Sequence, residues 1–252
     1  MPYYLHGINN RGQVNMDNLI TRNVLLKAGF IVAALLFSTS VYALPVTINA
    51  VGADWTNVVG GAGTVNYFDT DGIAGNEEIR FGTPAEIEQS GYRFDSAAPP
   101  AFTVETGEVF TLGNFTHTNQ PIWESITSAQ LDITADLMIG GSMLSEGPFT
   151  FSFLHNETTN ACEPLPDCAN DIVSFNSLVT SDSFLVDGIE YTLDLIGFSV
   201  DGVTTSEFST FERQTNTAQL QAVFRSTSVP EPASIALLGL GLLGVAFARR
   251  RV

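Results

Sequence analysis

The chain has 252 residues, of which 27 are acidic and ten are basic, and its formal net charge at pH 7 is −17. Such a surface repels phosphate backbones, which excludes nucleic acid as an expected partner and favours cations instead. Residues 44–228 alone hold 25 acidic residues, four arginines and no lysine. An acidic surface also keeps an exported protein soluble, and that simpler explanation stays open beside cation binding.

The first 43 residues have the organisation of a secretory signal peptide. A polar stretch, residues 1–21, shows no periodic pattern and is followed by Arg22 and Lys27. These two cations precede an apolar run from Ala28 to Phe37, which is the order of charge and apolar core found in export signals. We therefore expect residues 1–43 to direct the chain out of the cytoplasm.

Signal cleavage is expected between Ala43 and Leu44. Val41 and Ala43 place small side chains at the positions that a signal peptidase reads. The polar leader is long if translation begins at Met1, whereas Met16 would give a more usual length. We expect Met16 to be the true start.

Residues 44–228 are predicted to form one all-β domain, long enough to bury a full core. No helical period persists there, and the clearest alternation covers residues 131–139, where Leu, Ile and Ala alternate with Asp and Thr. This pattern predicts a strand with one buried face and one solvent-exposed face. Phe149, Phe151 and Phe153 repeat it. Aromatic residues at alternating positions fill the space between two sheets, so we predict a β-sandwich of jelly-roll type.

Shorter runs of the same kind predict the remaining strands. Asp187-Gly188 separates two of these runs and suits the two-residue turn of a β-hairpin. Turn residues space the runs at intervals typical of sandwiches. The predicted ranges are 46–51, 64–68, 78–81, 92–94, 108–112, 184–186, 189–195 and 220–224.

An acidic turn follows the second of these strands. When Tyr67 is counted as the first position, Asp69, Asp71 and Glu78 occupy the third, fifth and twelfth positions of a calcium-binding loop. The first position, usually Asp, is Tyr67, and flanking helices are not expected. A β-loop with this spacing can still wrap Ca²⁺, so calcium is a possible ligand. A solvated acidic turn is the alternative.

Cys162 and Cys168 are the two cysteines of the chain. An even pair in an exported protein predicts a disulfide. The loop between them is short and holds Pro164 and Pro166, so the bridge would stabilise the fold only modestly. A metal site made by the cysteines is the weaker alternative, since no histidine stands at ligand spacing from them.

No motif of a known catalytic type is found. The exported part holds two histidines, His117 and His155, and neither comes with a nucleophile elbow or a His-Glu-x-x-His metal motif. We interpret both as structural, with His117 at a strand end or turn. Trp55 and Trp123 could stack on sugar rings if both were exposed, but two buried tryptophans are the simpler expectation. We expect no enzymatic activity, with a glycan-active hydrolase as the alternative.

The C-terminal segment, residues 229–252, has three parts. Val229-Pro230-Glu231-Pro232 comes first, and its prolines predict an extended break. An uncharged run from Ala233 to Ala248 follows and predicts a transmembrane helix, although a stable span needs about 20 apolar residues. Arg249-Arg250-Arg251 would hold its end in the cytoplasm. A short helix of this kind suits temporary anchoring in the inner membrane.

These three parts in this order resemble the PEP-CTERM sorting signal of Gram-negative bacteria. The resemblance implies an exosortase-type enzyme as partner, which cuts near Pro-Glu-Pro. It also implies delivery to the cell surface or the exopolysaccharide matrix, with exopolysaccharide as a further possible partner. An ordinary C-terminal membrane anchor is the alternative.

The β domain resembles the choice-of-anchor K domain, a family found in front of interchangeable C-terminal anchors. Four short motifs carry the resemblance, which spans most of residues 45–226. Phe81-Gly82 departs from the Trp-Gly expected there, and the family implies architecture and location rather than an activity. The motifs are residues 76–82, 90–94, 115–122 and 156–160.

We therefore expect a non-enzymatic protein of the cell surface or extracellular matrix. It would be exported, anchored for a time in the inner membrane, and then processed at its C-terminal signal. A carbohydrate-binding or carbohydrate-active domain and a calcium-stabilised adhesion module are the alternatives. A groove with tryptophan and paired carboxylates would favour the first, and a calcium-dependent melting temperature would favour the second.

Overall fold

The computed structural model describes residues 43–61, 65–73, 75–159, 170–175, 183–228 and 241. These residues build an all-β domain of two curled sheets, as the alternation predicted. Its strands run in the following order: β1 (Val46–Gly60), β2 (Asn66–Phe68), β3 (Glu78–Phe81), β4 (Ser90–Ser96), β5 (Phe102–Val104), β6 (Val109–Asn119), β7 (Ile126–Ile139), β8 (Ser142–Asn156), β9 (Asp171–Phe175), β10 (Phe184–Val186), β11 (Ile189–Val200), β12 (Val203–Thr205), β13 (Glu207–Thr210) and β14 (Gln214–Ser228).

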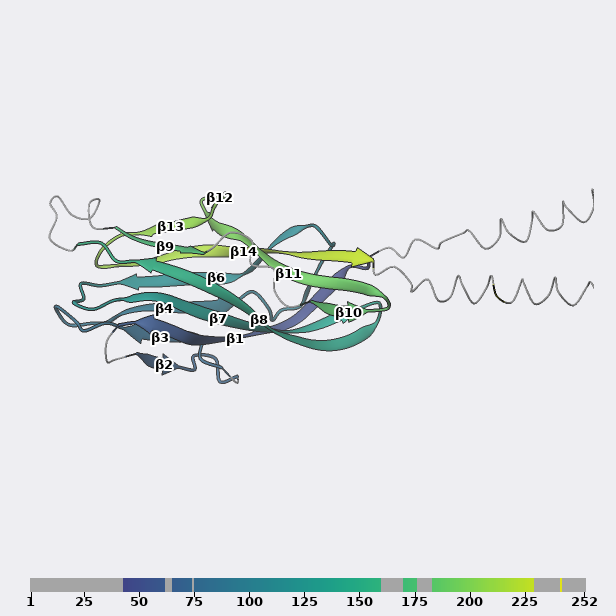
Figure 1. Ribbon diagram of the computed structural model, residues 1–252, viewed down its shortest axis with the longest axis horizontal. Helices are drawn as coiled ribbons and strands as arrows, with labels where there is room; N and C mark the ends of the chain where they lie inside the picture. The colour runs from purple at the N-terminus through teal and green to yellow at the C-terminus, as the bar shows by residue number, and fades with distance from the viewer. Residues whose placement is uncertain are drawn as a thin grey trace, which may run out of the picture. The chain divides into compact units, whose positions relative to one another are not determined.

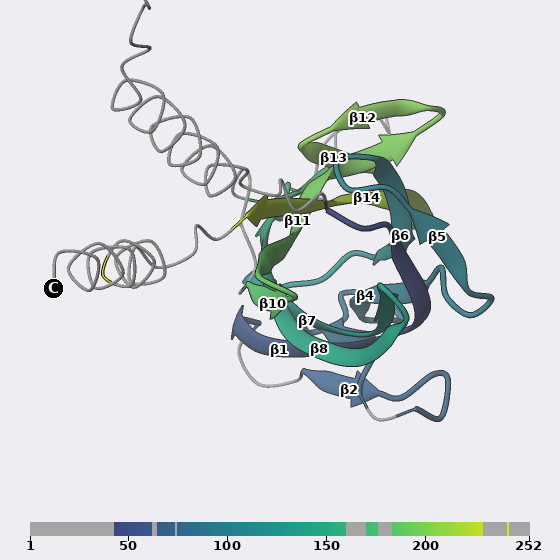
Figure 2. The same ribbon diagram turned by 90° about the vertical axis from the view of Figure 1, so that its right-hand side faces the viewer.

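The first sheet has the strand order β13-β9-β8-β7-β1-β5, and the second has the order β10-β11-β14-β6-β4-β3-β2, with β12 paired to β11. The ladders among the described strands are antiparallel. The long strands run side by side (Figure 1) and, viewed along their length, curl around one interior (Figure 2). Register shifts between β1 and β7 contribute to this curl, because bulges bend a strand and increase its twist.

Alternation places one face of each long strand in the core. On β7, Leu131, Ile133 and Leu137 are fully buried, while Asp132, Thr134 and Asp136 between them are not. Phe149, Phe151 and Phe153 on β8 are likewise buried and face the same interior. The predicted buried and wet faces of these two strands are therefore confirmed.

Aromatic rings join the two sheets across this interior. Trp55 on β1 lies 5.4 Å from Tyr92 on β4 and 5.5 Å from Phe153 on β8, measured between ring centroids. Phe153 also stacks on Phe115 of β6, with centroids 5.4 Å apart. Offset and edge-on contacts of this kind contribute about 0.5–1.5 kcal/mol each beyond the area they bury. The centre of the domain is thus an aromatic cluster to which both sheets contribute.

The predicted hairpin is present between β10 and β11. Val186 pairs with Ile189, which leaves Asp187 and Gly188 as a two-residue turn. Both have positive φ angles, 49° and 78° respectively. A turn with two such residues matches the right-handed twist of the flanking strands, which explains the Asp-Gly pair.

Strand β1 extends well beyond the predicted end at residue 51. Gly52, directly after that predicted end, lies inside the strand. A Cβ atom at this position would stand 2.7 Å from Oγ1 of Thr134 on β7. The glycine therefore permits close approach of two strands instead of ending one. The short strands β5, β9, β12 and β13 were not predicted, since three to five residues carry too little alternation.

The predicted signal peptide and transmembrane helix lie outside the described residues, apart from Ala43 and Gly241. In the part of the chain that the structure describes, there is no helix with the length and apolar character needed to span a membrane.

Phe153→Ala should lower the free energy of unfolding by about 3–5 kcal/mol, because it removes a ring packed against both sheets. Urea denaturation followed by tryptophan fluorescence measures the loss. Leu154→Ala is the matched control, because Leu154 is the next residue of β8 and points outward with 40% of its surface exposed. A loss below about 1 kcal/mol is expected for it, and equal losses for the two variants would contradict this account of the core.

Candidate functional site

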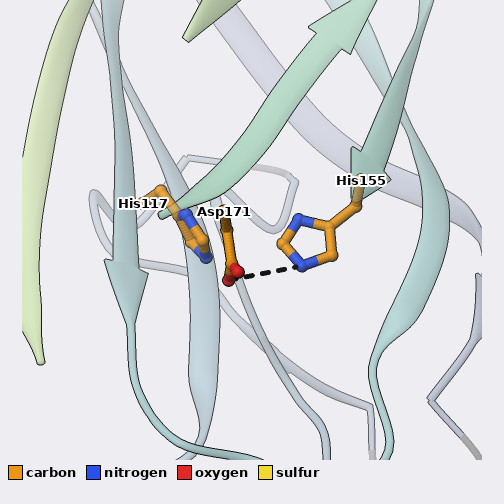
Figure 3. Close-up of side chains that lie close together, drawn as sticks. All are labelled: His117, His155 and Asp171. Atoms are coloured by element: carbon orange, nitrogen blue, oxygen red, sulfur yellow. Dashed lines mark ion pairs between the residues drawn. The ribbon is translucent and has the colours of Figure 1, made fainter. Parts of the chain in front are cut away.

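Ionisable side chains gather inside the domain, between the two sheets. His117 lies on β6 of the second sheet, whereas His155 on β8 and Asp171 at the start of β9 belong to the first. All three are buried, and their nearest ligand atoms lie within 4.8 Å of one another. Figure 3 shows Asp171 between the two imidazoles. We call His117, His155, Asp171, Glu157 and Glu212 the buried polar cluster.

Strand periodicity explains why the two histidines point inward. On β8, His155 is two residues after Phe153 and continues the face formed by Phe149, Phe151 and Phe153. On β6, His117 follows Phe115 in the same way. The imidazole centroids are 5.3 Å apart and the rings nearly perpendicular, at 89°. The alternation that places aromatic side chains in the core therefore also places these two imidazoles there.

Hydrogen bonds fix the tautomer of His117. Its Nδ1 lies 2.8 Å from the Thr210 hydroxyl, which donates its one hydrogen to the Asp171 carbonyl oxygen at 3.2 Å. Nδ1 of His117 must therefore be the N–H donor in the first contact. Burial lowers the pKa of His117 well below its usual range, and the nearby His155 adds to this effect. The ring is thus neutral, and its Nε2 lone pair has no hydrogen-bond partner among the residues that the structure describes.

His155 is held from both sides. Its Nδ1 lies 2.5 Å from the Tyr92 hydroxyl, and its Nε2 lies 3.2 Å from Oε2 of Glu157 and 3.8 Å from Oδ2 of Asp171. Burial is the main cause of a Tyr92 pKa well above its usual value, so the phenol stays protonated. His155 therefore lies between a phenol and two carboxyl groups.

Asp171 has one satisfied and one unsatisfied oxygen. Oδ1 accepts a hydrogen bond from the Thr158 backbone N–H at 2.8 Å, while Oδ2 has no hydrogen-bond partner. Burial, followed by the negative charge of Glu157, raises the pKa of Asp171 to about 8. Burial also raises the pKa of Glu212, and the negative charge of Glu157 adds to this effect. The cluster thus places several carboxyl groups in the protein interior, where burying a negative charge costs free energy.

A second acidic group surrounds the turn after β2. Asp69 and Asp71 lie within 4.8 Å of Glu77, not of the predicted Glu78. Glu78 instead accepts a hydrogen bond from Nε of Arg80 at 2.5 Å, because it is the first residue of β3 and points the other way. The spacing rule for a helical calcium loop does not apply to a turn entering a strand.

Backbone N–H groups already occupy oxygens of these three carboxylates. Asp69 accepts from Gly72 at 2.6 Å, Asp71 accepts from Ile73 at 2.7 Å, and Glu77 accepts from Thr70 at 2.8 Å. Such bonds stabilise a turn without an ion. Calcium binding by Asp69 and Asp71 stays a prediction, with Glu77 in place of Glu78 as the third carboxylate.

The predicted signal-cleavage site lies directly before the first strand. Ala43 and Leu44 are described, and β1 begins two residues later at Val46. The Leu44 backbone N–H donates to the Tyr191 hydroxyl at 3.0 Å. Cys162 and Cys168 lie outside the described residues, as do Val229, Pro230, Glu231, Pro232, Arg249, Arg250 and Arg251.

Residues 228–251 match the model of the PEP-CTERM protein-sorting motif. The chain carries this sorting motif. The matched range includes Val229-Pro230-Glu231-Pro232 and all three terminal arginines. A comparison with curated proteins finds no match for the chain.

The PEP-CTERM motif begins at the last residue of the β domain. Ser228 ends β14, where it pairs with Ile189 of β11, and β14 itself lies between β11 and β6. The first residue after this ladder is Val229. The matched range therefore overlaps β14 by one residue.

The buried polar cluster is the part of the site that sequence reasoning missed. The signal for His155 was present, because extending the Phe149-Phe151-Phe153 alternation by one step reaches it. From the sequence alone, His155 is interpreted only as structural. Asp171 and Glu212 could not have been placed beside it, since no local pattern connects the start of β9 and the residues after β13 with His155 on β8.

Thr210→Val should lower the free energy of unfolding by about 1–3 kcal/mol, because it leaves the buried Nδ1–H of His117 without an acceptor. Urea denaturation measures this change. Thr217→Val is the matched control, since the Thr217 hydroxyl makes an exposed contact of 3.0 Å with Thr116. Its expected effect is at most about 0.5 kcal/mol. Equal effects of the two substitutions would show that the buried contact is no more important than the exposed one.

Proposed function

We propose that the chain is an exported protein of the cell surface or exopolysaccharide matrix of a Gram-negative bacterium. The single observation that carries this proposal is the PEP-CTERM motif at residues 228–251. The motif marks proteins that exosortase-type enzymes sort toward the cell surface. In this proposal residues 1–43 act as signal peptide, and the apolar run 233–248 anchors the chain in the inner membrane until processing.

The β domain would be the part that remains at the surface. We assign it to a sandwich of the choice-of-anchor K type, and its two packed sheets are consistent with this assignment. Three of the four motifs behind that resemblance lie on or beside the neighbouring strands β3, β4 and β6. They contribute Tyr92 and His117 to the surroundings of the buried polar cluster, and the fourth motif contributes Glu157.

A structural or binding role is favoured over sugar hydrolysis. Trp55 is 1% exposed and Trp123 is 77% exposed, so these two tryptophans do not form a common platform for a sugar ring. The expectation of two buried tryptophans was wrong for Trp123. Asp171 and Glu212 are also buried, which puts them out of reach of a polysaccharide. Exposed Trp123 keeps glycan binding as the alternative, which a glycan array tests.

Mass spectrometry of the mature protein from its host tests the sorting proposal. With the processing enzyme present, we expect an N-terminus at Leu44 and a C-terminus near Pro230. Without the enzyme, the C-terminus should be Val252. An intact C-terminus in cells that contain the enzyme would contradict the proposal.

Combined Pro230→Ala, Glu231→Ala and Pro232→Ala substitutions should leave the chain unprocessed, because they remove the extended break that the enzyme is proposed to grip. Glu207→Ala, an exposed acidic residue on β13, is the control and should be processed normally. Normal processing of the triple variant would show that Pro-Glu-Pro is not what the enzyme reads.

A further inference from the structure

We propose that His117, His155 and Asp171 bind a divalent transition-metal ion, with Glu157 next to His155 and Asp171 in the same cluster. The ion class is that of Zn²⁺. This proposal does not rest on the sorting function, because it concerns the interior of the β domain alone. Its basis is the geometry of donor atoms that lie close together, of which His117 Nε2 and Asp171 Oδ2 are buried and have no hydrogen-bond partner among the described residues.

The donors converge to nearly the separation that a metal needs. Zn²⁺ binds nitrogen and oxygen at about 2.0–2.2 Å, so the donors of a tetrahedral site stand about 3.4 Å apart. In the buried polar cluster His117, His155 and Asp171 offer ligand atoms within 4.8 Å of one another. His155 Nε2 lies 3.8 Å from Asp171 Oδ2 and 3.2 Å from Glu157 Oε2. Small side-chain rotations would bring these donor atoms from within 4.8 Å of one another to the separation of about 3.4 Å.

The second ring nitrogen of each histidine makes the kind of hydrogen bond that metal-binding histidines usually make. Such a histidine gives its second ring N–H to an oxygen, which fixes the ring and leaves the other nitrogen for the metal. His117 does this through Thr210, and its Nε2 is left without a partner. His155 Nδ1 lies 2.5 Å from the Tyr92 hydroxyl oxygen, and this oxygen can accept a hydrogen bond from Nδ1–H when Nε2 binds the ion. The Thr158 N–H holds Oδ1 of Asp171 and leaves Oδ2 available.

Buried atoms without hydrogen-bond partners favour binding of a cation. Among the residues that the structure describes, His117 Nε2, Asp171 Oδ2 and Glu157 Oε1 have no hydrogen-bond partner. A buried polar atom left unpaired costs about 1–3 kcal/mol, and more when it is charged. One dication would satisfy several of these atoms together, and it would balance the carboxylates of Glu157, Asp171 and Glu212, which lie within 4.8 Å of one another.

Ligand chemistry selects the class of ion. Two imidazoles and carboxylates suit zinc and its transition-metal neighbours, whereas Ca²⁺ and Mg²⁺ take oxygen ligands. The Glu157 side chain is 19% exposed and so reaches the surface, while those of His155 and Asp171 are 0% exposed. A bound ion would connect β6 of the second sheet with β8 and β9 of the first. Its role would therefore be structural.

Metal binding is tested on the full chain in detergent, after treatment with a chelator. Added Zn²⁺ should be retained at one equivalent after buffer exchange, as measured by elemental analysis, and should raise the melting temperature. Co²⁺ should produce the visible absorption of a tetrahedral site. A chain that retains neither ion, with an unchanged melting temperature, would overturn the proposal.

Variants locate the site. Asp171→Asn and His117→Gln should each lower the Zn²⁺ affinity by more than 100-fold, since each removes a ligand. Thr210→Val should lower it by about 10–100-fold, the usual effect of losing a group that orients a ligand. Asp69→Asn, in the exposed acidic turn, is the control and should leave the stoichiometry and the Co²⁺ spectrum unchanged.

Two results with the variants would refute the assignment. Zn²⁺ retention that Asp69→Asn abolishes would place the ion in the acidic turn, and equal affinity in wild type and Asp171→Asn would remove Asp171 from the site. If Asp171→Asn and His117→Gln do not fold, the Co²⁺ spectrum of the wild type and the affinity of Thr210→Val decide the question.

Discussion

Contact between aromatic rings across the two sheets is the constraint on which the rest of the structure depends. Trp55 lies at its centre, packed against Tyr92, Phe115 and Phe153, and its indole Nε1 donates to the Glu77 carbonyl oxygen at 2.9 Å. The ring therefore joins the sheets and also holds the end of the acidic turn before β3. Sheets that curl around such a cluster must keep their register, because a shift of one residue would turn every ring outward.

The same aromatic contacts extend to the buried polar cluster. Tyr92 packs on Trp55 and Phe115 with its ring, and its hydroxyl contacts His155. Phe81 packs on both histidines, at 6.4 Å from His117 and 5.5 Å from His155 between centroids. The buried polar cluster is thus continuous with the aromatic core, and burial there lowers the pKa of His117 and raises the pKa of Asp171 and of Glu212. Stability and site chemistry depend on one set of contacts.

The sequence predicted what local patterns can encode. Alternation on β7 and β8 and the Asp187-Gly188 turn each lie within a few residues, and the structure contains them as expected. Contacts between distant segments were beyond this reasoning. Nothing local shows that Glu77 instead of Glu78 faces Asp69, since one residue of phase reverses the direction of a side chain. The meeting of Asp171 with His117 likewise depends on how the two sheets pack.

The position of β14 has a mechanical consequence for a protein held by its C-terminus. A pull on the chain beyond Ser228 acts first on β14, a strand of 15 residues bonded along most of its length to β11 on one side and β6 on the other. Force along the strand axis loads both ladders in shear, so many hydrogen bonds share it and must break together. An edge strand such as β2, with three residues and one neighbour, would instead peel away bond by bond. If the C-terminus anchors the protein as proposed, tension would enter the domain through a strand that is paired on both sides.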